Sequence, residues 1–426
     1  MLPRLFLLAL YASFGAAEVH RLGLKDCVEL ALRQNPDILV ARLDAEIAAQ
    51  QVRIHRDPFL PKLYTGSGLA YSSGFPLSVE GSVPSVVRAS SVATLINREQ
   101  RYLLQQAREA AKSAGLDSKV RQDEVVRRLF ELYVSAGRAA RSAEMARRQA
   151  DSTGKVFEIV SERVRGGREL PVEEKKARLD QARSLQRAEG LEAEQAMAET
   201  LLAALIGLAP GDRLRPVEED RPAFATPDSE QAAIEAALAA SGEVGRLESD
   251  IRAKGFQADS ARAAKLPRLD LLGEYALLAR FNNYEDFFKG FKRHNAQVGV
   301  SLLVPLFGGK AADARAAQAL AEAERLRLQL SSVRRRIATE VRQAWLDVRN
   351  AEGAREILRL ELDVARDSLG LLLARHEEGR AGLRDVEQAR LLENEKWLQY
   401  YDAEHSLDRA RIELLGLTGG LLASLR

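Results

Sequence analysis

Two stretches decide the fold of this chain, because the second repeats the residue pattern of the first at one fixed offset. Residues 345–389 read WLDVRNAEGAREILRLELDVARDSLGLLLARHEEGRAGLRDVEQA, and residues 133–177 read YVSAGRAARSAEMARRQADSTGKVFEIVSERVRGGRELPVEEKKA. They align at a constant offset of 212 positions without a gap. The repeating unit, at roughly 200 residues, is far longer than the 20–50 residues of a solenoid repeat. We therefore expect a duplicated domain whose halves form one quasi-symmetric body.

Both copies lie in long helical stretches with a strict heptad pattern. The seam of the second half consists of Ile337, Val341, Ala344, Val348, Ala351, Arg355, Leu358, Leu362, Ala365, Leu369 and Leu372. The same positions in the first half are Val125, Leu129, Leu132, Ala136, Ala139, Ala143, Ala146, Ala150, Thr153, Phe157 and Val160. A strict seven-residue period predicts coiled-coil packing. Periodicity alone leaves an ordinary isolated coiled coil open as an alternative.

Each half is expected to contain a helix, two strands, a long helix and a shorter helix. The first repeat covers residues 18–208, with strands at about 62–94, a long helix at 95–165 and a helix at 171–208. The second covers residues 230–417, with strands at about 268–281 and 296–306, a long helix at 310–378 and a helix at 383–417. Prolines mark residues 209–229 as a linker, and residues 418–426 form a short tail.

The N-terminus reads as a secretory signal over residues 1–17. Arg4 supplies a positive charge, a short apolar run follows, and Gly15, Ala16 and Ala17 provide small residues for cleavage. A buried N-terminal helix is the less favoured alternative. The segment indicates that the mature protein leaves the cytoplasm.

The strands of the second half alternate in the manner of a membrane barrel. One face of residues 268–281 carries Leu269, Leu271 and Tyr275, and the other carries Asp270 and Glu274. Such alternation is typical of apolar side chains facing lipid and polar ones facing a lumen, although a half-exposed soluble sheet gives the same pattern. In the first half we expect Pro84 and Arg88 to interrupt the second strand.

Four strands are too few for a membrane barrel, which needs at least about eight. An open sheet edge is not viable in lipid, because its backbone groups lack partners. If the strands enter a membrane, several copies must pool them. Three copies would supply twelve strands.

Composition argues against several other classes of function. The net charge is +2, which leaves no nucleic-acid footprint at chain level. None of the five histidines pairs with a second histidine or cysteine at metal-ligand spacing. Neither a phosphate loop nor a nucleophile elbow is present. We expect no enzyme activity, no metal and no cofactor.

In the order, lengths and motifs of its segments, the chain resembles the TolC family of outer-membrane efflux channels. The family-like pieces are residues 31–36 (ALRQNP), residues 304–309 (VPLFGG) and the turns after the two long helices. The resemblance implies a mainly α fold with a transmembrane β part: a homotrimeric α-helical barrel plus a twelve-stranded β-barrel in outer-membrane lipid. It also implies a periplasmic adaptor and an inner-membrane transporter as partners. The function implied is a passive exit duct for efflux or type I secretion.

The resemblance also implies roles for residues at the two turns. Asp385 matches an acidic residue of the family's pore constriction, Glu173 is its counterpart in the first repeat, and Gln388 stands where the family has a second acid. His376 lies at the position of a latch residue that holds the pore closed. Ala381 stands where the family has a latch arginine, and the adjacent Arg380 is its candidate substitute. The adaptor-docking residues implied are Arg163, Gly167, Arg168, Arg375, Gly379 and Leu383.

Two alternatives accompany this interpretation. Each tip residue could simply belong to a solvated turn with helix-capping glycines, since surface charges usually contribute little. The whole chain could be a periplasmic coiled-coil adaptor or structural protein without a membrane barrel. The two strand pairs, each placed between helices, favour the channel over the adaptor.

Overall fold

The computed structural model describes residues 18–69, 84–217, 227–280, 292–306 and 310–425, together with Phe224, Asp286, Lys289 and Gly290. The expected signal segment at residues 1–17 lies outside the described residues. The chain divides into two compact units. Unit 1 comprises residues 1–40, 120–241 and 335–426, and unit 2 comprises residues 41–119 and 242–334.

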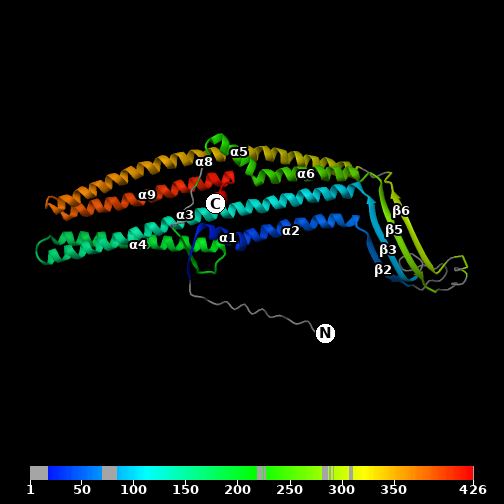
Figure 1. The fold of residues 1–426 in the computed structure, drawn as a ribbon, viewed down its shortest axis with the longest axis horizontal. Coiled ribbons are helices and arrows are strands. Elements are labelled where there is room, and N and C mark those ends of the chain that lie inside the picture. The colour runs from blue at the N-terminus through cyan, green and yellow to red at the C-terminus, as the bar shows by residue number, and fades with distance from the viewer. Residues whose placement is uncertain are drawn as a thin grey trace, which may run out of the picture. The chain divides into compact units, whose positions relative to one another are not determined.

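Unit 1 is built around long helices that run side by side (Figure 1). Its helices are α1 (Leu24–Gln34), α4 (Pro171–Ile206), α5 (Glu230–Ala240), α9 (Leu383–Thr418), and the later parts of α3 (Arg98–Arg165) and α8 (Ala311–Glu377). A short 3-10 helix, η3 (Ala423–Leu425), follows α9. Strands β1 (Val19–Leu22) and β4 (Arg213–Pro216) form a parallel pair beside them.

The heptad seams are the packed faces of α3 and α8. Every seam position in both repeats is buried or partly buried, and Leu129, Ala136 and Val341 are fully buried. Alanine at many of these positions lets helix axes approach closely. The predicted coiled-coil packing is therefore confirmed for the helices of unit 1.

The largest apolar core of unit 1 lies where α1, α3, α4, β4 and α9 meet. Phe130, Leu202, Ile206, Leu214 and Ile412 are fully buried there. The same region holds an ion pair on a buried carboxylate: Glu199 accepts a 2.8 Å bond from the guanidinium of Arg215, which is partly exposed. These contacts tie β4 to α4.

Unit 2 contains an antiparallel sheet with the strand order β2–β3–β5–β6 (Figure 1). Its strands are β2 (Lys62–Gly68), β3 (Ser85–Ile96), β5 (Arg268–Leu278) and β6 (His294–Leu303). The helices of this unit are α6 (Gly242–Ala263), the first parts of α3 and α8, and most of α2 (Pro36–Arg56), with a short 3-10 helix, η1 (Asp57–Phe59), before β2.

One strand differs from its prediction. We expected Arg88 to interrupt the second strand of the first repeat, but β3 runs through it without a break, and Pro84 precedes the strand. The reason is a counter-charge on the neighbouring strand: the Nε of Arg88 lies 2.8 Å from Oε1 of Glu274. A cross-strand partner of this kind stabilises a charge that would be unfavourable alone.

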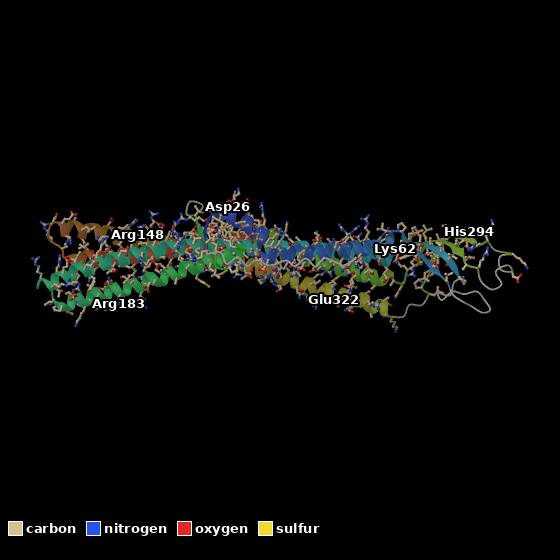
Figure 2. The ribbon with its side chains drawn as sticks, turned by 90° about the horizontal axis from the view of Figure 1, so that it is seen from below. Asp26, Lys62, Arg148, Arg183, His294 and Glu322 are labelled. Atoms are coloured by element: carbon tan, nitrogen blue, oxygen red, sulfur yellow. The ribbon has the colours of Figure 1, made fainter. Side chains whose placement is uncertain are left out.

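The long helices carry charged side chains throughout. Figure 2 shows Arg148 on α3, Arg183 on α4 and Glu322 on α8 among many others. Within the described part of the chain, none of the helices combines the length and the apolar character that a membrane crossing requires.

Candidate functional site

The turns at the ends of the two long helices have the same hydrogen-bonding geometry. After α3, the Arg168 N–H donates to the Arg163 carbonyl at 2.8 Å and the Gly167 N–H donates to the Val164 carbonyl at 3.0 Å. After α8, Arg380 donates to Arg375 at 2.7 Å and Gly379 donates to His376 at 2.9 Å. Both patterns satisfy helix-terminal carbonyls around a left-handed glycine. The internal repeat therefore extends to the details of these turns.

Asp385 is exposed at the start of α9 and caps that helix. Its Oδ2 accepts a 3.1 Å hydrogen bond from the backbone N–H of Gly382. Gln388 lies one turn further along α9 and is also exposed. An acid in the first turn is favoured by the helix dipole. A structural role for Asp385 is thus visible within one protomer, and its carboxylate remains accessible to solvent.

Glu173 joins the two turns. Its Oε1 accepts a 2.8 Å bond from Lys176 on the same helix, and its Oε2 lies 3.8 Å from the guanidinium of Arg384 on α9. The hydrogen bond from Lys176, with a smaller contribution from Arg384, holds the pKa of the Glu173 carboxyl below its ordinary value. Glu173 is therefore ionised at neutral pH and contacts the turn that carries Asp385.

The remaining predicted tip residues belong to the same two turns or to the helix ends beside them. His376 contacts the Ala381 carbonyl through Nδ1 at 2.8 Å, and Arg380 pairs with Glu378 at 3.1 Å. Arg163, Arg168 and Arg375 are exposed, and Leu383 begins α9. Within one protomer Glu173 and Arg384 bring the turns together, while the contacts of His376 and Arg380 among the described residues lie inside their own turn.

Sequence reasoning missed a set of polar contacts between α3 and its two neighbours. Arg138 pairs with Asp402 on α9 at 2.8 Å and also with Glu194 on α4. Arg141 lies 3.4 Å from Glu404 and 5.0 Å from the ring centroid of Tyr401, both on α9. Asn394 on α9 donates to Gln149 on α3. Heptad analysis ranks apolar seam positions, so these flanking residues gave no signal.

His405 sits inside this α3–α9 contact. Burial is the main cause that lowers the pKa of the His405 imidazole to about 4, and Arg138 and Arg409 lower it further. Its Nδ1 is buried and has no hydrogen-bond partner among the described residues. The imidazole is therefore neutral at pH 7.

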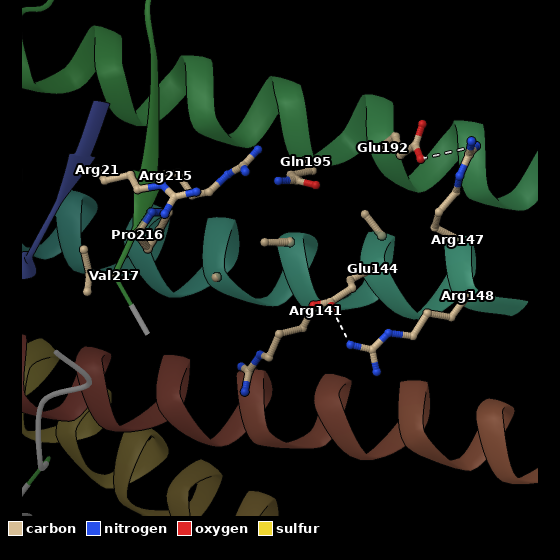
Figure 3. Close-up of a pocket in the computed structure, with 13 residues that line it drawn as sticks. Arg21, Arg141, Glu144, Arg147, Arg148, Glu192, Gln195, Arg215, Pro216 and Val217 are labelled. Carbon is tan, nitrogen blue, oxygen red and sulfur yellow. Dashed lines mark hydrogen bonds and ion pairs between the residues drawn. The ribbon is translucent and has the colours of Figure 1, made fainter. Parts of the chain in front are cut away.

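A groove of about 860 Å³ lies over α3 between α4 and the β1–β4 pair (Figure 3). Its charged lining consists of Arg21, Arg141, Arg147, Arg148, Arg215, Glu144 and Glu192. Four of these arginines pair with carboxylates. The pairs are Arg141–Glu404, Arg147–Glu192, Arg148–Glu144 and Arg215–Glu199. Carboxylates therefore offset most of the positive charge of the lining, and the two turns remain the candidate site.

Comparisons with known proteins agree on one family. The model of the family described as "Outer membrane efflux protein" matches residues 27–208 and 233–420. The alkaline protease secretion protein AprF of Pseudomonas aeruginosa is 25% identical over 411 residues, which cover 93% of this chain and 83% of AprF. The protein CyaE of Bordetella pertussis is 28% identical over 400 residues, covering 88% of this chain and 79% of CyaE.

Among solved structures, the chain is similar to the open state of the Neisseria gonorrhoeae MtrE outer membrane channel. The TM-score is 0.73 at 18% identity, and the match covers 94% of this chain and 89% of MtrE. At this level of identity the likeness concerns the fold.

Proposed function

Because this chain belongs to the outer membrane efflux protein family, we propose that three copies assemble into one export channel gated at its helix-to-helix turns. The protein is an outer-membrane channel with a large periplasmic helical part, and its family and fold are those of channels rather than of enzymes. What we propose for this chain is the trimer, the gate and the partners.

The observation that carries the trimer is the open sheet of unit 2. Strands β2 and β6 are its edges, and each pairs on one side only among the described strands. Apolar side chains on one face are uncovered: Leu63 is 78% exposed and Val298 is 84% exposed. Both features are unfavourable in isolation and are resolved when sheets from three protomers close a twelve-stranded barrel in lipid.

A second apolar stripe on α8 supports the same assembly. It consists of Leu346, Ile357, Leu360, Val364 and Leu371, all at least 46% exposed. These residues are separated by 11, 3, 4 and 7 positions, which fits a heptad repeat. The helix thus carries one seam packed within the protomer and a second seam that a neighbouring protomer would cover.

The gate is proposed at the turns described above. In a trimer, three copies of Asp385 would form an acidic ring that favours cations, with Gln388 beside it and Glu173, His376 and Arg380 supporting the closed arrangement. An adaptor would dock on Arg163, Gly167, Arg168, Arg375, Gly379 and Leu383. Docking would loosen the Glu173–Arg384 contact and widen the aperture, and an inner-membrane transporter would supply the energy.

Protein secretion is the first transport class to test. The name of AprF describes secretion of an alkaline protease, and its similarity to this chain is not confined to one repeat. The substrate itself would be chosen by the transporter and the adaptor.

Image averaging of the detergent-extracted protein tests the assembly. We expect a particle with three-fold symmetry and a detergent belt at one end. A species without a detergent belt would contradict the barrel. It would favour the alternative of a periplasmic coiled-coil protein.

The gate is tested by ion selectivity in planar bilayers. We expect Asp385→Asn to reduce the preference for cations, because it removes the ring's charge while keeping an oxygen that can accept from Gly382. Asp385→Ala removes both charge and cap. If only the alanine variant changes the current, the cap rather than the charge is responsible.

A further inference from the structure

An ion pair joins strands β3 and β5 of the sheet, away from the turns of the proposed gate. Oε1 of Glu274 on β5 lies 2.8 Å from Nε of Arg88 on β3, and Oε2 accepts a 3.2 Å bond from Nε2 of Gln297 on β6. Both carboxylate oxygens are therefore held, and three neighbouring strands take part. The side chains of Arg88 and Glu274 are 32% and 28% exposed.

These residues share the polar face of the sheet. Glu274 is in register with Ser90 and Gln297, and Arg88 is in register with Ala276, two residues along β5. Successive residues of a strand point to opposite faces. Val298 therefore lies on the other face of the sheet, which it shares with Leu271 and Val300. A second acid on the polar face, Asp270, also has a cation nearby, because Arg268 lies 3.6 Å from it.

We infer that Arg88 is a residue that sets ion selectivity in the strand-built part of the channel, by neutralising Glu274 on the wall of the lumen. This inference rests on the proposed function, because the polar face borders a lumen only in a closed barrel with its apolar face toward lipid. In each protomer the charges of Arg88 and Glu274 offset one another, so that discrimination by charge falls mainly to the Asp385 ring.

Neutralising either residue changes the net charge of the wall. In a trimer Arg88→Gln removes three positive charges from it, and Glu274→Gln removes three negative charges. A single unit charge about 8 Å from a passing ion in water changes the local concentration of that ion about two-fold. We therefore expect each variant to shift the cation-to-anion permeability ratio at least about two-fold, in opposite directions.

The experiment is the reversal potential of single channels in planar bilayers under a potassium chloride gradient. Every variant is made in an Asp385→Asn background, so that the proposed gate does not mask the result. Arg88→Gln should shift the reversal potential toward cations and Glu274→Gln toward anions. The double variant, and the exchange of Arg88 for Glu with Glu274 for Arg, should both return the background value.

Gln297→Leu is the matched control. It removes the second hydrogen bond to Glu274 without changing any charge, so the reversal potential should stay at the background value. If Arg88→Gln and Glu274→Gln leave the potential unchanged in conducting channels, the inference is overturned while the channel stands. If the background protein itself forms no channels, the proposed function fails first.

Discussion

Gly167 and Gly379 end the two long helices with left-handed backbone, at φ values of 69° and 72°. A residue with a Cβ atom pays roughly 1–2 kcal/mol in this conformation. Gly166 is different, since an added Cβ would lie 3.5 Å from the Glu162 carbonyl oxygen, an ordinary contact, and its φ is not positive. The three glycines look alike in sequence, but only two of them are required by the backbone.

We therefore expect Gly167→Ala and Gly379→Ala each to weaken their turn by about 1 kcal/mol. Amide hydrogen exchange in the flanking helix turns should become about five-fold faster, because 1.4 kcal/mol corresponds to a factor of about ten. Gly166→Ala is the matched control and should leave exchange unchanged. Equal effects at Gly166 and Gly167 would show that backbone strain is not the cause.

His405 predicts a pH dependence of unit 1. Its pKa is about 4 in the folded protein, below the ordinary value of 6.5. Between these values the unfolded chain binds more protons, so stability rises with pH in that window. The contribution of His405 is complete above about pH 6.5 and is lost as the pH falls toward 4.

Urea unfolding at several pH values between 4.5 and about 7.5 measures this contribution. Wild-type protein should lose more stability on acidification than His405→Gln, whose side chain does not titrate. The difference between the two proteins isolates His405 from the carboxylates, which titrate in both. Parallel curves would mean that the imidazole is solvated in the folded state.

At the scale of elements, the seams of α3 and α8 could be predicted because a heptad repeat depends only on the order of residues along one helix. The course of β3 through Arg88 could not, because the favourable counter-charge comes from Glu274, which is 186 positions away in the chain. The candidate turns were predicted from the family resemblance together with the 212-residue internal repeat. The cap that Asp385 forms and the contact between Glu173 and Arg384 needed the folded backbone.

Arg138 connects three helices, since it pairs from α3 with Glu194 on α4 and Asp402 on α9. We expect Arg138→Ala to lower the free energy of unfolding by about 1–2 kcal/mol, because two ion pairs and the packed stem of the side chain are lost together. Arg327→Ala is the control: its pair with Glu324 lies within α8 and is exposed. It should cost at most about 0.5 kcal/mol.

Chemical unfolding with a helix signal compares the two variants. If Arg138→Ala lowers the free energy of unfolding no more than Arg327→Ala does, the three-helix contact contributes no more to stability than an exposed surface pair. A larger loss would identify Arg138 as a residue that holds α9 against α3.

At the scale of the whole molecule, the apolar surface that the protomer leaves uncovered leads us to expect that the working form is an assembly of several copies. Ile357 is 60% exposed and Val364 is 66% exposed, on a helix whose other seam is buried or partly buried. Contiguous apolar surface of this kind marks an interface between proteins. We expect Ile357→Asp combined with Val364→Asp to yield monomers in detergent, because a buried carboxylate without a partner is strongly unfavourable.

Arg359→Asp tests whether charge alone disperses the protein. Arg359 is on the same stretch of α8 but outside the second apolar stripe, and its side chain is 56% exposed. Sedimentation in detergent should give a trimer for wild type and Arg359→Asp and a monomer for the double variant, with equal helix content in all three by circular dichroism. A double variant that stays trimeric would place the protomer contact elsewhere, and one that loses helix content would show that the stripe is needed inside the protomer. Only the combination of lost assembly and preserved helices assigns the stripe to a second copy of the chain.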